Sequence, residues 1–350
     1  MDLNCSKDFP TTEVLYQLLS SDVTVLIFTI IDVVISCIVI GLFAEEVWFL
    51  FNNCHDSSKR TKTILLLALY PVVVSASTLC ILVPTSTLIG EFVSSIYLSF
   101  CVYIFVNLVI DYLGGLNNVL CNYKDRTISF RTGPCCCCCV CLDSIPITRR
   151  TMMVIKGLVL QVAILRPILL FFLAVLWSDG KYSLQQQSDF TNPASYINLV
   201  NAVSTLLSIY GLMVTFRSTR VKLKTYRLTL KFISLQGSLL FMNVQSFITG
   251  FLGRAGIPEC SNTIGSPIRA SRVNHFLLVL EMFLFALLAR FAYRTVEESS
   301  DDDEEDRANE TKVESNDADT NENKNGVADT NLGIDDEVSS SPQEVDDLLD

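Results

Sequence analysis

Long, uninterrupted runs of apolar residues dominate the first 296 positions of the chain. A membrane-spanning helix needs about 20 mostly apolar residues, because the bilayer core is ~30 Å thick and a helix rises ~1.5 Å per residue. Continuous runs also exclude the ~10-residue alternating segments of a transmembrane barrel. Backbone groups inside a bilayer find no water, so each run is predicted to be a helix. The seven predicted spans cover residues 23–43, 63–83, 92–112, 152–177, 194–216, 230–252 and 273–294.

Basic residues in the connecting segments predict the orientation of these spans. Cytoplasmic loops carry an excess of Lys and Arg, and the segments on one side carry 14 of them against 5 on the other. We therefore expect an all-α integral membrane protein with seven transmembrane helices over residues 23–296. Residues 1–22 would form an extracellular N-terminus, and residues 297–350 a cytoplasmic tail.

The net charge of −11 is unevenly distributed. Residues 297–350 contain 21 acidic and 3 basic side chains, a net charge of −18, whereas residues 1–296 carry +7. A segment with few aliphatic side chains and many like charges is typical of disorder, which we predict for the acidic tail. Near its end, Glu344 precedes Leu348 and Leu349 in a pattern that resembles the acidic dileucine signal read by clathrin adaptors. This pattern predicts a sorting signal and endosomal cycling.

Six cysteines stand close together in the predicted cytoplasmic loop before the fourth span. The reducing cytosol disfavours disulfides there, and contiguous cysteines lack the CxxC spacing that wraps a tetrahedral metal ion. Juxtamembrane cysteines are natural sites of S-palmitoylation, which would hold the loop at the inner leaflet. We expect palmitoylation, with an unmodified apolar loop as the alternative. The six are Cys135, Cys136, Cys137, Cys138, Cys139 and Cys141.

Two features are predicted for the outer side of the membrane. Asn4 begins an Asn-Cys-Ser glycosylation sequon, although its position so close to the terminus leaves its use open. Cys5 and Cys260 are the cysteines predicted to face the oxidising exterior, so a disulfide between them is a further hypothesis.

Ionisable residues within predicted spans are the first candidates for a functional site, because their burial in a bilayer costs several kcal/mol. Asp32, Arg166 and Glu281 lie in the outer halves of the first, fourth and seventh spans, at similar depth. They would form one polar cluster if these three spans are neighbours. Two interpretations stay open: Arg166 binds an anionic substrate with the carboxylates as counter-ions, or the three form a buried ion pair that holds helices together.

A polar stripe runs along the fifth span. Residues spaced i, i+3, i+7 and i+10 share one face of a helix. Such a stripe either lines a polar path for a substrate or joins membrane helices by hydrogen bonds. Its members are Asn198, Asn201, Thr205 and Ser208.

Signatures of enzymes and ATP-driven pumps are missing from the sequence. The two histidines, His55 and His275, cannot form an HExxH zinc site, and there is no GxxxxGK[ST] phosphate-binding loop. We therefore expect no catalytic residues, no cofactor, no bound metal and no nucleic-acid partner. Transport, if that is the function, would run down a gradient or be coupled to ions.

Several stretches of the last five predicted spans resemble the organic solute transporter alpha family. They are Tyr103 to Gly115, the cysteine run after Pro134, Gln161 with Arg166 and Pro167, Lys231 and Phe232 with Gln236 and Gln245, and Asn274 to Ala286. The resemblance implies a plasma-membrane carrier for facilitated movement of amphipathic organic anions, such as steroid conjugates and bile-acid-like molecules. It also implies a single-span beta-type subunit as partner, beside membrane lipids. The alternatives are a seven-helix receptor and a trafficking or lipid-organising membrane protein.

Overall fold

The computed structural model describes residues 12–115, 127–128, 145–146, 148–179, 193–220, 223, 226–260 and 264–294. The chain divides into two units, Met1–Glu297 and Glu298–Asp350, and all the described residues belong to the first. The predictions that lie outside the described residues are those for the acidic tail and for Asn4, Cys5, Cys135, Cys136, Cys137, Cys138, Cys139, Cys141, Glu344, Leu348 and Leu349.

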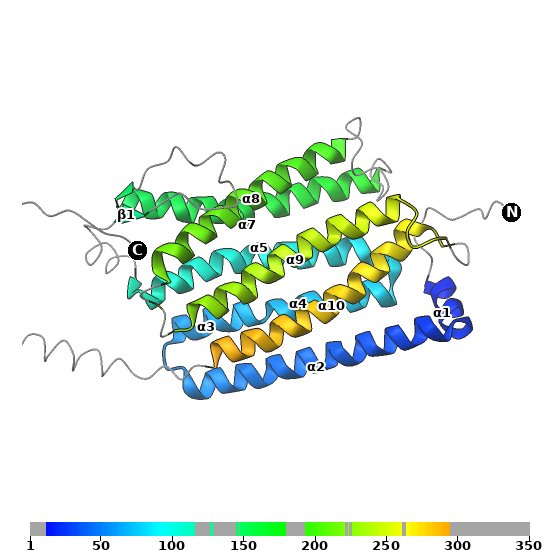
Figure 1. Ribbon diagram of the computed structural model, residues 1–350, viewed down its shortest axis with the longest axis horizontal. Helices are drawn as coiled ribbons and strands as arrows, with labels where there is room; N and C mark the ends of the chain where they lie inside the picture. The colour runs from blue at the N-terminus through cyan, green and yellow to red at the C-terminus, as the bar shows by residue number, and fades with distance from the viewer. Residues whose placement is uncertain are drawn as a thin grey trace, which may run out of the picture. The chain divides into compact units, whose positions relative to one another are not determined.

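Long helices lying side by side make up the first unit (Figure 1). The helices are α1 (Thr12–Ser21), α2 (Val23–Asn53), α3 (Ser57–Leu67), α4 (Leu69–Leu82), the 3₁₀ turn η1 (Pro84–Ser86), α5 (Thr87–Tyr112), α7 (Arg149–Ser178), α8 (Pro193–Thr219), α9 (Leu228–Arg254) and α10 (Ser266–Tyr293). Two short antiparallel strands, β1 (Thr127–Ile128) and β2 (Ile145–Pro146), complete the described elements.

Six helical segments of the described chain are long and apolar enough to cross a membrane, and they coincide with six of the predicted spans. The predicted span 230–252 lies in α9, a helix of 27 residues that does not reach the same apolar composition. By length and composition, the structure therefore supports six spans in the described residues, and the seventh stays a prediction.

Several polar side chains of α9 form hydrogen bonds with Asn274 of α10. Gln245 Nε2 donates to the backbone and side-chain oxygens of Asn274 at 2.8 and 3.1 Å, and Thr249 Oγ1 donates to the same side-chain oxygen at 3.0 Å. The two helices also approach closely, because a Cβ on Gly253 would lie 3.0 Å from that of Ala270. Small residues and hydrogen bonds of this kind join helices inside membranes, so the polarity of α9 is largely used within the bundle.

Two helix boundaries differ from the sequence-based expectation. Helix α2 begins where expected, capped by Asp22, but continues ten residues past the predicted end at 43 and ends at Asn53. The predicted span 63–83 is divided at Ala68 into α3 and α4. Pro71 explains the break, because it has no N–H for the carbonyl of Leu67 four residues earlier.

The order of packing places α7 and α8 on one side of the bundle and α2 on the other (Figure 1). Helix α7 packs mainly against α8 and α5, while α10 packs against α9, α4 and α2. Apolar side chains such as Leu69, Phe105 and Met282 are buried between the helices. Apolar side chains of α2, Ile30 and Ile38 among them, remain exposed, as expected for a helix that faces lipid.

Candidate functional site

A polar cavity lies within the bundle, and its described lining residues come from α4, α5, α7, α8, α9 and α10. This central cavity has a volume of about 270 Å³. Most of its polar lining is neutral, with Ser, Thr and Asn side chains on several helices. The lining residues that bear most on its chemistry are Glu91, Arg166, Asn198, Asn201, Ser246 and His275.

Arg166 is the cation of the central cavity, and only 4% of it is exposed. Its Nε donates to Asn201 Oδ1 at 3.1 Å and its Nη2 donates to Thr205 Oγ1 at 2.8 Å. Among the described residues, no carboxylate forms an ion pair with it. Hydrogen bonds to a charged group contribute about 1.5–3 kcal/mol each. The two bonds orient the guanidinium.

The polar stripe of the fifth predicted span lies on α8, and three of its four members lie at this site. Asn198 lines the central cavity, and Asn201 and Thr205 bind Arg166. Ser208, one turn farther along α8, is buried and its hydroxyl has no hydrogen-bond partner. The stripe therefore joins α8 to α7 and also lines the central cavity, while its role as a substrate path stays a prediction.

The structure does not bring Asp32 and Glu281 to Arg166. Neither carboxylate is among the described lining residues of the central cavity. Asp32 Oδ2 accepts a hydrogen bond from Thr78 at 2.9 Å, whereas Asp32 Oδ1 and Glu281 Oε2 are buried without partners. The reason is the order of helices: α2 packs against α4 and α10, while α7 packs against α8 and α5. Similar depth in the membrane did not make these residues neighbours.

Glu91 is a cavity residue that the sequence-based spans missed. The third span was expected to begin at residue 92, but α5 begins at Thr87 and includes Glu91 in its second turn. It is the one carboxylate among the described lining residues. The signal was present in the sequence, because Pro84 marks a helix start several residues earlier than the apolar run does.

His275 is a second missed residue. It lines the central cavity from α10, is 3% exposed, and neither ring nitrogen has a hydrogen-bond partner among the described residues. An unpartnered buried polar group costs about 1–3 kcal/mol, so a ring that borders a cavity is poised to bind a polar ligand. A histidine inside an apolar span could have been selected by the same rule that selected Arg166.

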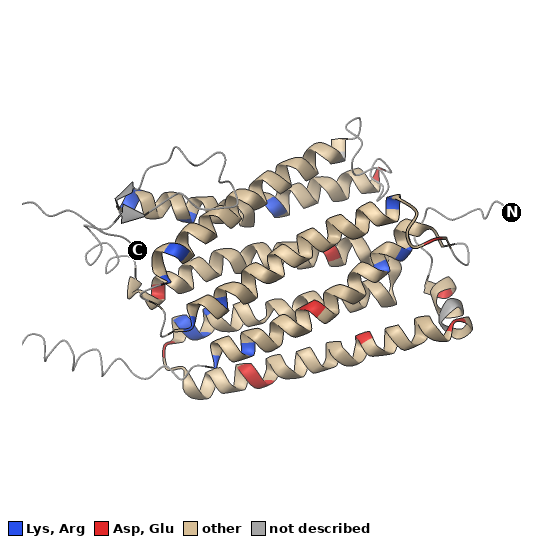
Figure 2. Cartoon of the chain, in the orientation of Figure 1, with Lys and Arg blue, Asp and Glu red and all other residues tan. Residues whose placement is uncertain are grey.

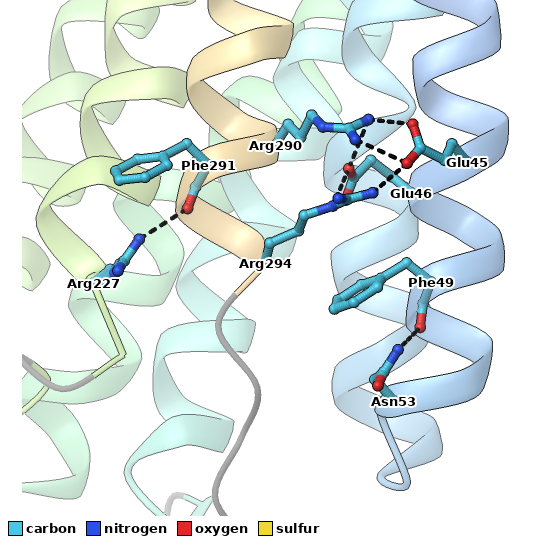
Figure 3. A network of polar contacts seen from close by, with 8 residues as sticks. All are labelled: Glu45, Glu46, Phe49, Asn53, Arg227, Arg290, Phe291 and Arg294. Atoms are coloured by element: carbon cyan, nitrogen blue, oxygen red, sulfur yellow. Dashed lines mark hydrogen bonds and ion pairs between the residues drawn. The ribbon is translucent and has the colours of Figure 1, made fainter.

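Figure 2 shows that many charged residues of the described helices lie toward the helix ends, while a few lie within the length of the helices. At the end of α10, Arg290 and Arg294 extend toward Glu45 and Glu46 of α2 (Figure 3). Arg290 Nη2 lies 2.8 Å from Glu45 Oε1, and Arg294 Nε lies 2.9 Å from Glu46 Oε1. Glu46 is buried, with 4% of its side chain exposed, against 47% for Glu45. We call these four residues the charge clamp; it joins α2 to α10.

Cys260 is disulfide-bonded. Of the other described cysteines, Cys37, Cys80 and Cys101 are free. Cys5 lies outside the described residues, so its pairing with Cys260 stays a prediction.

Comparison with known proteins gives a consistent family. A family model described as "Organic solute transporter Ostalpha" matches residues 27–298. The chain is 31% identical over 253 residues to the organic solute transporter subunit alpha of Danio rerio, covering 72% of this chain and 77% of the relative. It is 32% identical to that of Leucoraja erinaceus (73% and 72% covered) and 30% identical to that of Homo sapiens (73% and 75% covered). No solved structure matches significantly.

Proposed function

Because the chain belongs to the organic solute transporter alpha family, we propose that it moves amphipathic organic anions across the plasma membrane by facilitated transport. Steroid conjugates and bile-acid-like molecules are the proposed substrates. Family membership identifies a multi-pass membrane protein that is a transporter subunit, which is consistent with a protein that is not an enzyme, and it favours transport over the receptor and trafficking alternatives. The observation that carries the substrate class is Arg166, a buried cation at the wall of a polar cavity that forms no ion pair with any carboxylate of the described residues.

The chemistry of the central cavity suits an amphipathic anion. A guanidinium has five N–H donors in a planar fork that matches a carboxylate or sulfate, and two of its nitrogens already bond to α8. The remaining donors and the ring of His275 supply polar contacts. Phe92, Leu170 and Leu278 supply apolar contacts for the body of the ligand.

The size of the central cavity indicates that transport requires movement. Its volume of about 270 Å³ lies just below the ~300–1,000 Å³ typical of sites for drug-sized ligands. A steroid conjugate with its anionic group would need a wider cavity. We therefore propose that the helices around Arg166 separate during the transport cycle.

The proposed setting includes a partner and an orientation. The relatives are named as subunits, and we propose a single-span beta-type subunit for this chain, with the N-terminus outside. The disulfide at Cys260 supports an oxidising, outer location for the segment between α9 and α10. Palmitoylation of the six-cysteine run, a glycan on Asn4, and endosomal cycling through clathrin adaptors at Glu344, Leu348 and Leu349 belong to the same proposal.

Uptake of a radiolabelled steroid sulfate into oocytes tests the proposed function. The chain is expressed alone and with candidate single-span partners, and surface abundance is measured in parallel. Arg166→Ala is expected to lower uptake at least about tenfold, the effect of losing one strong charged hydrogen bond. Arg166→Lys should retain only part of the activity, because lysine keeps the positive charge but lacks the planar set of N–H donors of the guanidinium.

The matched control is Arg254→Ala, which removes an arginine whose Nε bonds to a carbonyl of its own helix. Uptake by this variant should stay at the level of the unmodified chain. Unchanged uptake by Arg166→Ala at normal surface abundance would remove Arg166 from the mechanism.

A further inference from the structure

A second cavity lies at the end of the bundle where α2 and α10 begin and α4 ends. This terminal pocket has a volume of about 440 Å³ and shares no described lining residue with the central cavity. Its volume falls within the ~300–1,000 Å³ typical of sites for drug-sized ligands. The lining residues used below are Asp22, Thr24, Phe28, Arg269, Arg272 and Phe276.

The walls of the terminal pocket are largely apolar. Phe28 of α2 and Phe276 of α10 meet edge to face with ring centroids 5.2 Å apart. Ile81 at the end of α4 and Val273 of α10 extend this surface. Phe28 and Val273 are exposed, so the apolar surface is accessible and not sealed inside the bundle. Such a surface suits a compact apolar body, which would gain by leaving water.

The charge of the terminal pocket is positive. Arg269 and Arg272 are three residues apart on α10, which places them side by side on one face where like charges repel. Among the described residues neither forms an ion pair with a carboxylate. Asp22 is the acidic residue of the described lining, and its carboxylate accepts from the backbone N–H of Thr24 at 3.1 Å as the cap of α2. An anion bound between the two arginines would relieve their repulsion.

We propose that the terminal pocket binds a dissolved amphipathic anion. The apolar body packs against Phe28 and Phe276, and a carboxylate, sulfate or sulfonate group binds Arg272 and Arg269. The guanidinium of Arg272 is the more available donor to the anionic group, because Arg269 Nη1 already donates to the carbonyl of Glu259. The role of this pocket as the first binding site on a transport path rests on the proposed function, whereas binding itself does not.

Saturation binding to the purified full-length protein tests this proposal. The protein is placed in nanodiscs of phosphatidylcholine, with tritiated estrone sulfate as the probe and uncharged estrone as the charge control. The double variant Arg269→Gln/Arg272→Gln should raise the Kd of one binding component, the one that belongs to the terminal pocket, at least about tenfold. Arg166→Ala and the matched arginine control Arg254→Gln should leave that component unchanged.

A photoreactive diazirine analogue of estrone sulfate gives a second readout that needs no variant. It should label the peptides that contain Phe28 or Phe276. Labelling confined to α7 and α8, or unchanged binding by a double variant of normal thermal stability, would overturn the proposal. If phosphatidylserine in the nanodiscs displaces estrone sulfate, the terminal pocket would be assigned to a lipid, and the proposal would also be overturned. Loss of uptake with binding retained would refute only the proposed transport function.

Discussion

Helices α2 and α10 meet at both ends of the bundle, and each end presents two arginines of α10 to α2. At one end, Arg290 and Arg294 are matched by Glu45 and Glu46 in the charge clamp. At the other end, Arg269 and Arg272 face aromatic and aliphatic side chains in the terminal pocket, and no carboxylate of the described residues pairs with either.

The difference shows how the same residue type serves structure at one end and ligand binding at the other. An arginine with its carboxylate in place stabilises a helix contact, and little of its charge is left for another partner. An arginine beside an open apolar surface keeps its charge available. The pairing state of an arginine therefore tells more about its role than its position in the sequence does.

The largest expected effect is the loss of the buried half of the charge clamp. Glu46→Ala leaves Arg294 without its 2.9 Å partner and should lower the free energy of unfolding by about 2 kcal/mol. Thermal unfolding of the purified protein in detergent measures this change. Glu45→Ala is the matched control and should have the smaller effect, since Glu45 is 47% exposed. A larger loss for Glu45→Ala would contradict the role assigned to burial.

A glutamate placed at the opposite end should turn the terminal pocket into a second clamp. Thr24→Glu puts a carboxylate on α2 near Arg269 and Arg272 and near the positive helix N-terminus. It should raise the free energy of unfolding by about 0.5–1 kcal/mol and prevent binding of estrone sulfate in the terminal pocket. Thr24→Gln, which has the same shape without the charge, should do neither. Equal effects of Thr24→Glu and Thr24→Gln would show that pairing with a carboxylate is not what distinguishes the two ends of the bundle.

Removing an arginine from each end sharpens the comparison further. Arg272→Gln should change the free energy of unfolding by less than about 0.5 kcal/mol, because no carboxylate depends on it. Arg294→Gln should cost more than about 1 kcal/mol, because Glu46 loses a charged hydrogen bond. Both are measured by thermal unfolding under the same conditions. A greater loss for Arg272→Gln would mean that the terminal pocket is a structural contact.

The smallest expected effect is that of salt. Raising the ionic strength from about 0.1 M to about 1 M shortens the Debye length from ~10 Å to ~3 Å. Binding of estrone sulfate to the accessible terminal pocket should weaken several-fold at the higher salt concentration. The weak binding of uncharged estrone should stay constant. Equal salt dependence of the two ligands in equilibrium binding would argue against an arginine contact in the terminal pocket.

The positions of the helices were largely predictable, because apolar runs of about 20 residues have few alternatives in a bilayer. Helix ends were less so. Helix α2 continues past residue 43, where Glu45 is paired with arginines 245 and 249 residues away, a contact that no local pattern contains. Lys231 near the start of α9 is a similar case: it is buried, and its Nζ lies 3.0 Å from Tyr112 Oη, a contact that no local pattern contains.

The part of the candidate site that depends on helical periodicity was predictable from the sequence. The spacing of Asn201 and Thr205 put them on one face of α8, and the structure places that face against Arg166. The expected approach of Asp32 to Arg166 failed because depth along a helix does not determine which helices are neighbours. Glu91 was missed because the apolar run begins after α5 does. The local sequence pattern thus identified residues of the candidate site, while the packing order of the helices determined which of them contact one another.

The two hydrogen bonds of Arg166 also have a mechanical consequence. They fasten α7 to α8, and α7 packs mainly against α8 and α5, whereas α8 makes only slight contact with α9. Any displacement of α7 that widens the central cavity must carry α8 with it as one rigid body. We infer that the moving part is this helix pair, and that it separates from α5 on the α7 side and from α9 on the α8 side.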